Sequence, residues 1–423
     1  MAKKVLILCN DFPPINSIGA DRPYSWYKYF KEFDLYPVVI TKNWKTDGNN
    51  GLPLVDNKSD HEITEYGEVI RSKMQHTPST KFHEIFGNRF ALLRKGLSLV
   101  EIMFGYYLSI LDRHRSIYFE AKEYLKNNEV EAIITTGEPF ILFLHGLQLK
   151  RQFGIKWVAD YRDGWYFNHI RTLQKDVFNK IIRNWELRIE RKVTQHADLI
   201  VTVDPEMAER LSELVAKKVE VVYNGFWDFH NIESVKSNEN ELIINHTGTL
   251  TSGQQLELFL DALKELYTDK KIEEGKFCFN LIGLEYFPEQ MKRLMPYDDL
   301  IGRIVFTTPR LPKEVAINLN ARADYLLNFT DPNLSAIYAK TYDYIATKKP
   351  ILVVPGDKKL LENLVIENKL GFVLNSKEEI KTFLINPVQW NSGKSKISFF
   401  MRKKQAADFT IKIKQLIGFQ KVN

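Results

Sequence analysis

Short, uninterrupted apolar runs alternate with longer amphipathic segments along the first half of the chain. The first two runs, 5–9 and 37–41, end in turn residues, as do strands that are buried on both faces of a sheet. The aromatic residues of 26–30, between these runs, have helical spacing. Further apolar runs follow at 132–136, 157–160, 199–203 and 219–222. The order of strand, helix and strand predicts a parallel sheet with helices on its faces.

The same alternation of apolar runs and amphipathic segments begins again after a polar stretch, 231–241, which we interpret as a linker. Apolar runs recur at 242–245, 277–282, 304–306, 325–328, 350–354 and 371–374, and a long helix is predicted at about 398–416. We therefore predict an α/β protein with two doubly wound, Rossmann-like domains, 1–228 and 229–396, that face a central cleft. In such sheets ligands bind beyond the carboxyl ends of the strands.

One segment of the first domain, 82–124, departs from the alternation of apolar runs and amphipathic segments. It is rich in large apolar residues, and Arg89, Arg94 and Lys95 lie among them. The pattern predicts one or two amphipathic helices with a basic rim. They are either ordinary helices packed on the sheet or interfacial helices that lie on an anionic lipid surface, and the two interpretations are compatible.

Composition supports a two-domain protein that has an anionic partner. The 423 residues exceed what one core usually organises, and the formal net charge is +6. Cys9 and Cys278 lie in apolar runs, so we expect buried thiols, and no residue spacing suggests a metal site. The apolar run near the N-terminus is too short for a signal peptide, and no run approaches 18 apolar residues. We therefore expect a cytoplasmic protein.

Two loops that follow strands in the first domain contain candidate binding residues. The loop 10–22 includes Asp11, Gly19 and Arg22 before a helix, where backbone amides favour an anion, but a plain turn would look similar. Glu138 follows the strand 132–136. It either holds a sugar hydroxyl or is an acid in the first turn of a helix, since Pro139 suits a first helical position.

The next strand of the first domain ends in a cluster of charged residues. Asp160, Arg162 and Asp163 lie within four residues and are followed by Trp165. Such a cluster is unusual for a solvated surface and favours a site in which Trp165 stacks on a sugar ring or a lipid chain. The alternative is an internal Asp–Arg pair that only shapes the loop.

The second domain begins with a strand that leads into a turn of small and hydroxyl residues, 246–253. Gly248, Thr249 and Gly253 belong to this turn, which precedes a helix. Backbone amides and hydroxyl groups in this arrangement can bind a pyrophosphate. A generic strand-to-helix turn would need fewer glycines and hydroxyls.

The segment 335–344 gives the strongest local signal in the sequence. Lys340 and Asp343 are three residues apart on one predicted helix, so both side chains can point at one ligand. Lys340 would meet a diphosphate as a point charge, and Asp343 would accept hydrogen bonds from two ribose hydroxyls. A salt bridge between the two residues is the alternative.

Several short blocks, taken in order over nearly the whole chain, resemble the family 4 glycosyltransferases. The blocks are 10–14 with Gly19, 135–137, 160–165, 223–226, 247–250, and 340–344 with 348–350. The resemblance implies a retaining, metal-independent enzyme with the GT-B fold and a UDP- or GDP-type sugar donor, without a cofactor. It also implies that the C-terminal helix, 397–423, crosses back to the first domain.

The resemblance assigns roles to the candidate residues. It implies that the first domain binds the acceptor, through Asp11, Arg22, Asp160, Arg162, Asp163 and Trp165. It implies that the donor is bound by Gly19, Gly248, Thr249, Gly253, Thr307, Ser335, Lys340 and Asp343, and that Lys340, Asp343 and Glu138 act in catalysis. The family has an acid where this chain has Ser335, and an Arg and a Lys where it has Thr249 and Gln254.

We therefore expect a hexosyltransferase that acts on a glycan or lipid-linked glycan in surface polysaccharide synthesis at the inner face of a bacterial plasma membrane. The alternatives are a sugar-nucleotide epimerase on the same fold and a catalytically silent sugar-nucleotide-binding scaffold, which the departures at Ser335, Thr249 and Gln254 suggest. Nucleic acid is not expected as a partner, because basic residues are scattered along the chain.

Overall fold

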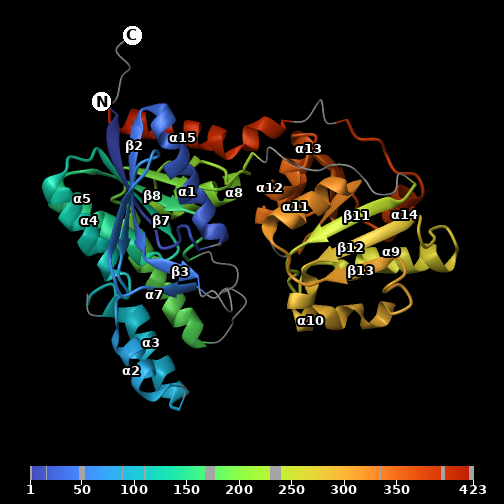
Figure 1. The fold of residues 1–423 in the computed structure, drawn as a ribbon, viewed down its shortest axis with the longest axis horizontal. Helices are drawn as coiled ribbons and strands as arrows, with labels where there is room; N and C mark the ends of the chain where they lie inside the picture. The colour runs from blue at the N-terminus through green and yellow to red at the C-terminus, as the bar shows by residue number, and fades with distance from the viewer. Residues whose placement is uncertain are drawn as a thin grey trace, which may run out of the picture. The chain divides into compact units, whose positions relative to one another are not determined.

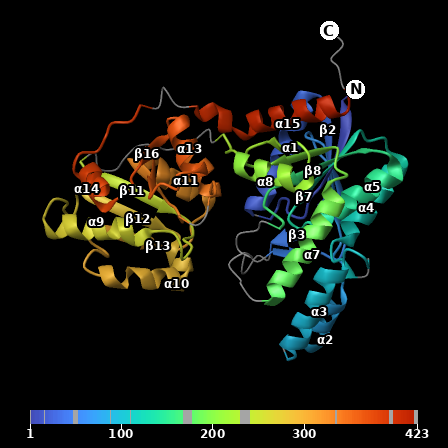
Figure 2. The same cartoon turned by 180° about the vertical axis from the view of Figure 1, so that it is seen from behind.

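A computed structural model describes residues 2–15, 17–46, 53–87, 89–108, 111–166, 177–228, 240–332, 335–391 and 396–418. They form two compact units: unit 1 contains Met1–Tyr223 and Gln405–Asn423, and unit 2 contains Asn224–Lys404. Each unit contains a mainly parallel sheet covered by helices (Figures 1 and 2). The predicted α/β class with two doubly wound halves is confirmed. The predicted linker, 231–241, lies almost entirely outside the described residues.

Unit 1 has an eight-stranded sheet whose strand order is β10-β9-β8-β7-β1-β2-β6-β5. The strands are β1 Lys3–Leu8, β2 Leu35–Lys42, β5 Asp60–Ile63, β6 Glu68–Ser72, β7 Ala132–Gly137, β8 Lys156–Tyr161, β9 Leu199–Thr202 and β10 Glu220–Val221. Only β5 runs antiparallel to its neighbour, and β3 Trp44–Thr46 pairs separately with β4 Pro53–Val55. The chain runs from β1 to β2 on one side and later returns to β7 on the other, so the strand order reverses between β1 and β7.

The helices of unit 1 cover both faces of this sheet. They are α1 Ile18–Tyr29, α2 Pro78–Phe86, α3 Ala91–Phe104, α4 Arg115–Asn127, α5 Ile141–Phe153, α7 Val177–Thr194, α8 Pro205–Val215 and most of α15 Arg402–Leu416. Successive residues of β1 face opposite sides: Leu6 and Leu8 contact the α4 side, and Val5 and Ile7 contact the side of α1 and α15. A buried strand must be apolar on both faces, which explains the uninterrupted run 5–9.

The C-terminal helix α15 contributes directly to the core of unit 1. Its residues Ala406, Phe409 and Ile413 are fully buried. The ring of Phe409 lies 5.0 Å from that of Trp26 and 5.9 Å from that of Phe30, between ring centroids. The last helix of the sequence therefore packs on the first.

Unit 2 has a six-stranded parallel sheet in the order β13-β12-β11-β14-β15-β16. The strands are β11 Leu242–Thr247, β12 Phe277–Ile282, β13 Val305–Thr308, β14 Tyr325–Phe329, β15 Ile351–Val354 and β16 Gly371–Val373. The helices are α9 Leu256–Thr268, α10 Pro288–Met291, α11 Lys313–Arg322, α12 Ala339–Ala346, α13 Leu360–Glu367 and α14 Lys377–Ile385. The strand order reverses between β11 and β14.

The segment 82–124 forms parts of three helices instead of the predicted one or two. Helix α4 buries Ile117, Ala121 and Leu125 against the sheet, as an ordinary core helix does. Helices α2 and α3 pack on each other and project from the sheet (Figures 1 and 2), and much of their apolar surface is exposed. The interpretation as a packed helix is therefore confirmed for α4, and the interpretation as interfacial helices stays a prediction for α2 and α3. Among the described residues, no helix has the length and apolar character needed to span a bilayer.

Replacing Phe409 with alanine should lower the free energy of unfolding by about 3–5 kcal/mol, because a large buried ring is lost and a cavity remains. The matched control is Ile411→Ala on the same helix, whose side chain is exposed. That change should stay within about 0.5 kcal/mol of the native protein. Urea denaturation of both variants measures the difference, and equal stabilities would contradict the packing of α15 described above.

Candidate functional site

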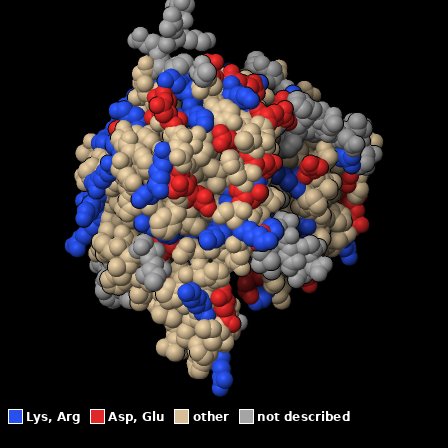
Figure 3. Space-filling model, turned by 60° about the vertical axis from the view of Figure 1, so that its left-hand side comes forward, with Lys and Arg blue, Asp and Glu red and all other residues tan. Residues whose placement is uncertain are grey.

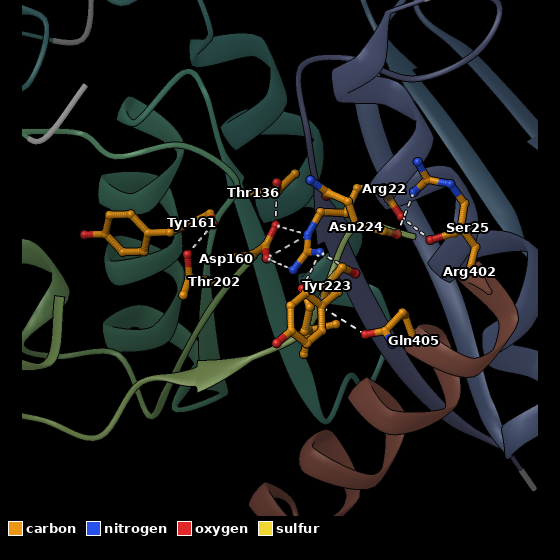
Figure 4. Close-up of polar contacts among 11 residues, drawn as sticks. Arg22, Ser25, Thr136, Asp160, Tyr161, Thr202, Tyr223, Asn224, Arg402 and Gln405 are labelled. Atoms are coloured by element: carbon orange, nitrogen blue, oxygen red, sulfur yellow. Dashed lines mark hydrogen bonds and ion pairs between the residues drawn. The ribbon is translucent and has the colours of Figure 1, made fainter. Parts of the chain in front are cut away.

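A buried ion pair joins two predicted acceptor residues, Arg22 and Asp160, in the interior of unit 1 (Figure 4). Both side chains are almost completely buried. The guanidinium donates from Nε at 3.0 Å and from Nη2 at 2.7 Å to Asp160 Oδ1, and from Nη1 to the carbonyl of Val222 at 2.8 Å. Thr136 donates to the other carboxylate oxygen at 2.7 Å. Asp160 is therefore paired within the protein, but with Arg22 and not with nearby Arg162, and an acceptor role for this pair stays a prediction.

Three other predicted residues of unit 1 come together beside this pair. Ser17 caps α1 by accepting from the amide of Ala20, and it donates to Asp11 Oδ2 at 2.8 Å. A side chain on Gly19 would put its Cβ 1.8 Å from Arg162 Nη1 and 2.7 Å from Asp11 Oδ2. Glycine at this position therefore allows the guanidinium and the carboxylate to approach α1.

Arg162 also lies near an exposed acid. Its Nε is 3.4 Å from Asp163 Oδ2, and the Asp163 side chain is 56% exposed. Asp11, Gly19, Arg162 and Asp163 thus form one polar cluster at the start of α1, where a ligand hydroxyl or an anion can reach charged groups of both signs.

A cavity of about 250 Å³ in unit 1 brings Glu138 and Trp165 together. It lies among α3, α5, α7 and the loops after β7 and β8. The lining residues are Glu101, Gly105, Tyr106, Leu111, Asp112, Arg113, His114, Glu138, Pro139, Phe140, Ile141, Trp165 and Glu186. Trp165 is 2% exposed, and its ring stacks with those of Phe140 at 5.1 Å and Tyr106 at 5.5 Å, between ring centroids. Trp165 therefore builds an aromatic wall, and its predicted contact with an acceptor is untested.

The polar groups of this cavity suit a ligand that has hydroxyl groups. Asp112 accepts from the amide of His114 at 2.8 Å and lies 2.7 Å from His145 Nε2. Burial raises the pKa of Asp112, but the charge and hydrogen bond of His145 outweigh burial and keep this pKa below its usual value. Burial and the charge of Lys42 lower the pKa of His114 to about 3, so this ring is neutral at physiological pH. Carboxylates and a neutral imidazole can accept hydrogen bonds from sugar hydroxyls.

The backbones of the loops that follow β11, β12 and β13 in unit 2 lie close together. Gly248 after β11 has φ +91° and Gly283 after β12 has φ +88°, both in the left-handed region that favours glycine. A Cβ on Gly283 would lie 3.9 Å from the amide nitrogen of Gly248 and 3.9 Å from Cα of Arg310, which follows β13. The glycines therefore leave exposed backbone and a guanidinium at one edge of the sheet. The sequence predicted a role for Gly248 but not for Gly283, which is a single glycine after an apolar run.

Lys340, in the first turn of α12, reaches the point where the strand order of unit 2 reverses. Its Nζ donates to the carbonyl of Thr249 at 2.9 Å and lies 3.2 Å from His246 Nε2. Because a lysine ammonium can only donate, His246 Nε2 accepts, and its Nδ1 donates to the carbonyl of Leu327 on β14 at 2.8 Å. Burial lowers the pKa of Lys340 to about 7. Among the described residues no carboxylate forms an ion pair with this amine. No role was predicted for His246, although it is the first residue of the predicted turn 246–253.

Asp343 binds a different cation, so the predicted alternative of a Lys340–Asp343 salt bridge does not form in this structure. Its Oδ1 lies 3.2 Å from Nζ of Lys313 on α11. The two residues nevertheless share one short helix, as the i, i+3 spacing implied.

The remaining predicted donor residues have different surroundings. A Cβ on Gly253 would lie 1.8 Å from Asp331 Oδ2, so this glycine allows the acid after β14 to approach the turn. Thr307 donates to exposed Glu285 at 2.8 Å. Ser335 Oγ is buried and has no hydrogen-bond partner among the described residues. No group of three or more His, Cys, Asp and Glu in the described ranges is arranged to hold a metal ion.

Comparison with protein families gives one match. Residues 91–226 match the model for Glycosyltransferase Family 4. This segment begins at α3, ends three residues after Tyr223, and includes Glu138, Asp160 and Trp165. No curated protein matches the sequence.

Solved structures that resemble the whole chain include three from different organisms. A glycosyltransferase from Rickettsia africae is 14% identical, with 99% of each chain covered and a TM-score of 0.58. The catalytic domain of starch synthase IV from Arabidopsis thaliana, bound to ADP and acarbose, is 10% identical, with 99% of each chain covered and a TM-score of 0.58. An alpha,alpha-trehalose-phosphate synthase (UDP-forming) from Burkholderia vietnamiensis is 9% identical, with 99% of this chain and 100% of that chain covered and a TM-score of 0.61. These neighbours confirm the predicted GT-B fold.

Removing either partner of the Arg22–Asp160 pair should be strongly destabilising. Arg22→Ala leaves a buried carboxylate without its cation, and Asp160→Ala leaves a buried guanidinium without its anion. Each should cost about 3–5 kcal/mol of unfolding free energy. The double variant should cost much less than the sum of the two, because it leaves neither charge unpaired. Urea titrations of the three variants would contradict a coupled pair if the effects were additive.

Proposed function

We propose, from the premise that this chain resembles the family 4 glycosyltransferases and has the GT-B fold, that it is a retaining hexosyltransferase. The family match and the fold support a glycosyltransferase that uses a nucleotide-sugar donor. The finer proposal is transfer of a hexose from a nucleoside diphosphate sugar to a glycan or lipid-linked glycan in surface polysaccharide synthesis. The observation that carries it is the Lys340 amine at the switch point of unit 2, beside two glycine turns.

The surroundings of Lys340 favour a diphosphate ligand. Its amine contacts a carbonyl and a neutral imidazole and lies 6.0 Å from the ring centroid of Tyr338, and none of these groups supplies a full counter-charge. An anionic oxygen would satisfy this charge better than the carbonyl of Thr249 does. Gly248 and Gly283 leave room for a ligand beside the backbone, and the exposed Arg310 provides a further donor at the same edge. Asp343 would bind the ribose hydroxyls, in competition with Lys313.

The transfer then needs leaving-group stabilisation more than a protein nucleophile. The bond between the anomeric carbon and the diphosphate oxygen breaks, and a bond to the acceptor oxygen forms on the same face of the sugar. The acceptor hydroxyl gives its proton to the departing diphosphate. Lys340 and the backbone amides would stabilise the negative charge that develops there, without a metal ion. This is the role that we assign to Lys340 in catalysis.

The acceptor is assigned to unit 1. The cavity that contains Glu138 combines an aromatic wall with carboxylates, which suits the apolar faces and the hydroxyls of a sugar. Glu138 would orient the reacting hydroxyl. A lipid carrier for this acceptor would place the enzyme at the inner face of the plasma membrane.

A nucleotide should stabilise the protein, and Lys340 should account for much of the effect. At about 100 times its Kd, one of UDP, GDP or ADP should raise the unfolding free energy by about 2.7 kcal/mol. Lys340→Ala should weaken binding by about 10- to 100-fold, since a charged hydrogen bond of about 1.5–3 kcal/mol is lost. A thermal-shift titration measures both.

The matched control is Lys276→Ala, which removes an exposed lysine next to the amino end of β12, at the opposite edge of the same sheet. It should leave the nucleotide response unchanged. If Lys340→Ala and Lys276→Ala respond alike, the donor assignment is wrong.

Nucleotide affinity should fall as the pH rises above about 7. The lowered pKa of Lys340 means that the free amine is charged below pH 7 and loses its proton above it. A bound diphosphate favours the charged form and raises this pKa, so binding above pH 7 requires proton uptake. Kd should therefore rise by up to about tenfold per pH unit above 7. Calorimetric titration with UDP at pH 6, 7, 8 and 9 measures the slope.

Two variants isolate the contribution of Lys340 to this pH dependence. Lys340→Arg should remove the rise in Kd, because an arginine stays charged. Lys340→Ala should also lack this rise in Kd, because it has no amine to titrate. Any effect of pH on the ionisation of the nucleotide itself is the same for the native protein and both variants. A slope that survives in both variants would assign the pH dependence to another group.

A further inference from the structure

Helices α2 and α3 present an apolar surface that the described parts of the chain leave uncovered. The structure describes twenty exposed large hydrophobic side chains, and nine of them lie in this hairpin and the turn after it. They are Ile85, Phe86, Phe90, Leu92, Leu93, Val100, Phe104, Tyr107 and Leu108. Single exposed apolar residues are normal on a protein surface, but a contiguous group of this kind marks a binding surface.

The apolar residues of α3 follow a helical period along one face. Leu93, Leu97, Val100 and Phe104 are spaced by three or four residues. In a helix of a globular protein such a stripe normally faces the core. Here Leu93 is 61% exposed and Phe104 is 46% exposed. The helix therefore has the face of a buried helix without the covering that such a face usually has.

The charges around this surface are mainly basic, and the exposed acid beside it, Glu84, pairs with His76. The stretch 85–100 contains Arg89, Arg94 and Lys95 and no acidic residue. The guanidinium of Arg89 lies 5.6 Å from the ring centroid of Phe90, and the Lys95 side chain is exposed. Figure 3 shows the projecting end of unit 1 as mostly uncharged surface, with basic and acidic groups above and a basic group at its tip. Two copies of this surface would bring like charges together, whereas an anionic bilayer offers both acyl chains and opposite charge.

We propose that the α2–α3 hairpin inserts its tip into the surface of an anionic lipid bilayer. The apolar side chains of α3 would enter the boundary between headgroups and acyl chains, and Arg89, Arg94 and Lys95 would pair with lipid phosphates. This surface is separate from the switch point of unit 2, so the proposal assigns a membrane-binding element that donor binding does not use.

The same helix connects this surface to the cavity of unit 1. The C-terminal end of α3 and the residues just after it line the cavity, through Glu101, Gly105 and Tyr106. Leu92 and Glu101 are nine residues apart, which corresponds to about 14 Å along a helix. Interfacial helices bury their apolar faces about 5–10 Å into this boundary, so the cavity would lie close to the lipid headgroups. The identity of its ligand, the sugar of a lipid-borne acceptor, rests on the proposed function.

Flotation of the full-length protein with vesicles tests the docking. Vesicles of equal parts phosphatidylglycerol and phosphatidylcholine should carry the protein, and vesicles of phosphatidylcholine alone should carry much less. The double variant Leu92→Glu, Leu93→Glu should bind the anionic vesicles at least about tenfold more weakly, since the burial of two leucines is lost. Arg89→Gln and Lys95→Gln should each weaken binding by about fivefold and reduce its dependence on salt.

The matched control is Ile366→Glu on α13, which places the same charge at another exposed apolar position. It should float as the native protein does. Native protein that fails to float, or a Leu92→Glu, Leu93→Glu variant that floats equally well, would overturn the proposal. A protein that forms dimers which this double variant separates, and that does not float, would show that the surface binds a second copy instead.

A fluorescence measurement tests the depth of the cavity. Trp185 lies at 5.5 Å from Tyr106 and 6.3 Å from Tyr107, between ring centroids, and so reports on the cavity rim. Phosphatidylcholine brominated at acyl carbons 6 and 7, mixed into the anionic vesicles, should quench the native protein. Trp185→Phe should remove at least half of that quenching, and unchanged quenching would contradict a cavity near the headgroups.

The nucleotide response separates this proposal from the proposed function. The Leu92→Glu, Leu93→Glu variant should keep the native thermal shift with nucleotide, which also shows that it folds. Loss of flotation with a normal nucleotide response supports the docking surface. Flotation without any response to UDP, GDP or ADP would leave the docking surface in place and refute the donor assignment.

Discussion

The buried ion pair between Arg22 and Asp160 fixes the geometry on which unit 1 depends. It joins α1 to the end of β8, and its remaining donor holds the carbonyl of Val222 where the chain leaves the sheet. The energetic value of such a pair is small relative to an apolar replacement, because both charges lose their hydration. Its value lies in specificity, since a bidentate pair accepts only one relative placement of helix and strand. That placement brings Asp11, Gly19 and Arg162 into one cluster.

The buried cation of unit 2, Lys340, has no carboxylate partner among the described residues, whereas Arg22 of unit 1 has one. Arg22 has a carboxylate and two carbonyls as partners, whereas Lys340 has one carbonyl and one imidazole. Burial without a counter-charge lowers the pKa of Lys340, because the charged form of the amine is unfavourable there in the ligand-free protein. Such a cation is stabilised when an anion arrives. The contrast separates a charge that maintains the fold from a charge that is available to a ligand.

The parallel sheets could be predicted from the sequence because a strand buried on both faces must be apolar throughout. The run 277–282 coincides with β12, whereas β6 was missed, since Glu68 and Arg71 break its apolar pattern. Pairing partners could not be predicted in the same way. Asp160 has an arginine two residues away in the sequence, but it pairs with one 138 residues away, and Asp343 pairs with Lys313 on another helix. The sequence identifies which side chains are charged, but only the tertiary fold decides which of them form ion pairs.

The three helices of 82–124 show that the surface which covers an apolar residue could not be predicted from the sequence either. Helical spacing in the sequence marks an apolar face on α3 as well as on α4, and the spacing contains no information about what covers each face. In the structure α4 is covered by the sheet, and α3 is covered by nothing in the described chain except α2 and its own C-terminal anchor, where Glu101 binds Ser79 and Arg113. A helix fixed by buried polar contacts at one end can expose apolar groups at the other without losing its position. Exposure of this stripe is therefore compatible with a rigid unit 1, and the neighbouring basic residues determine which kind of surface can cover it.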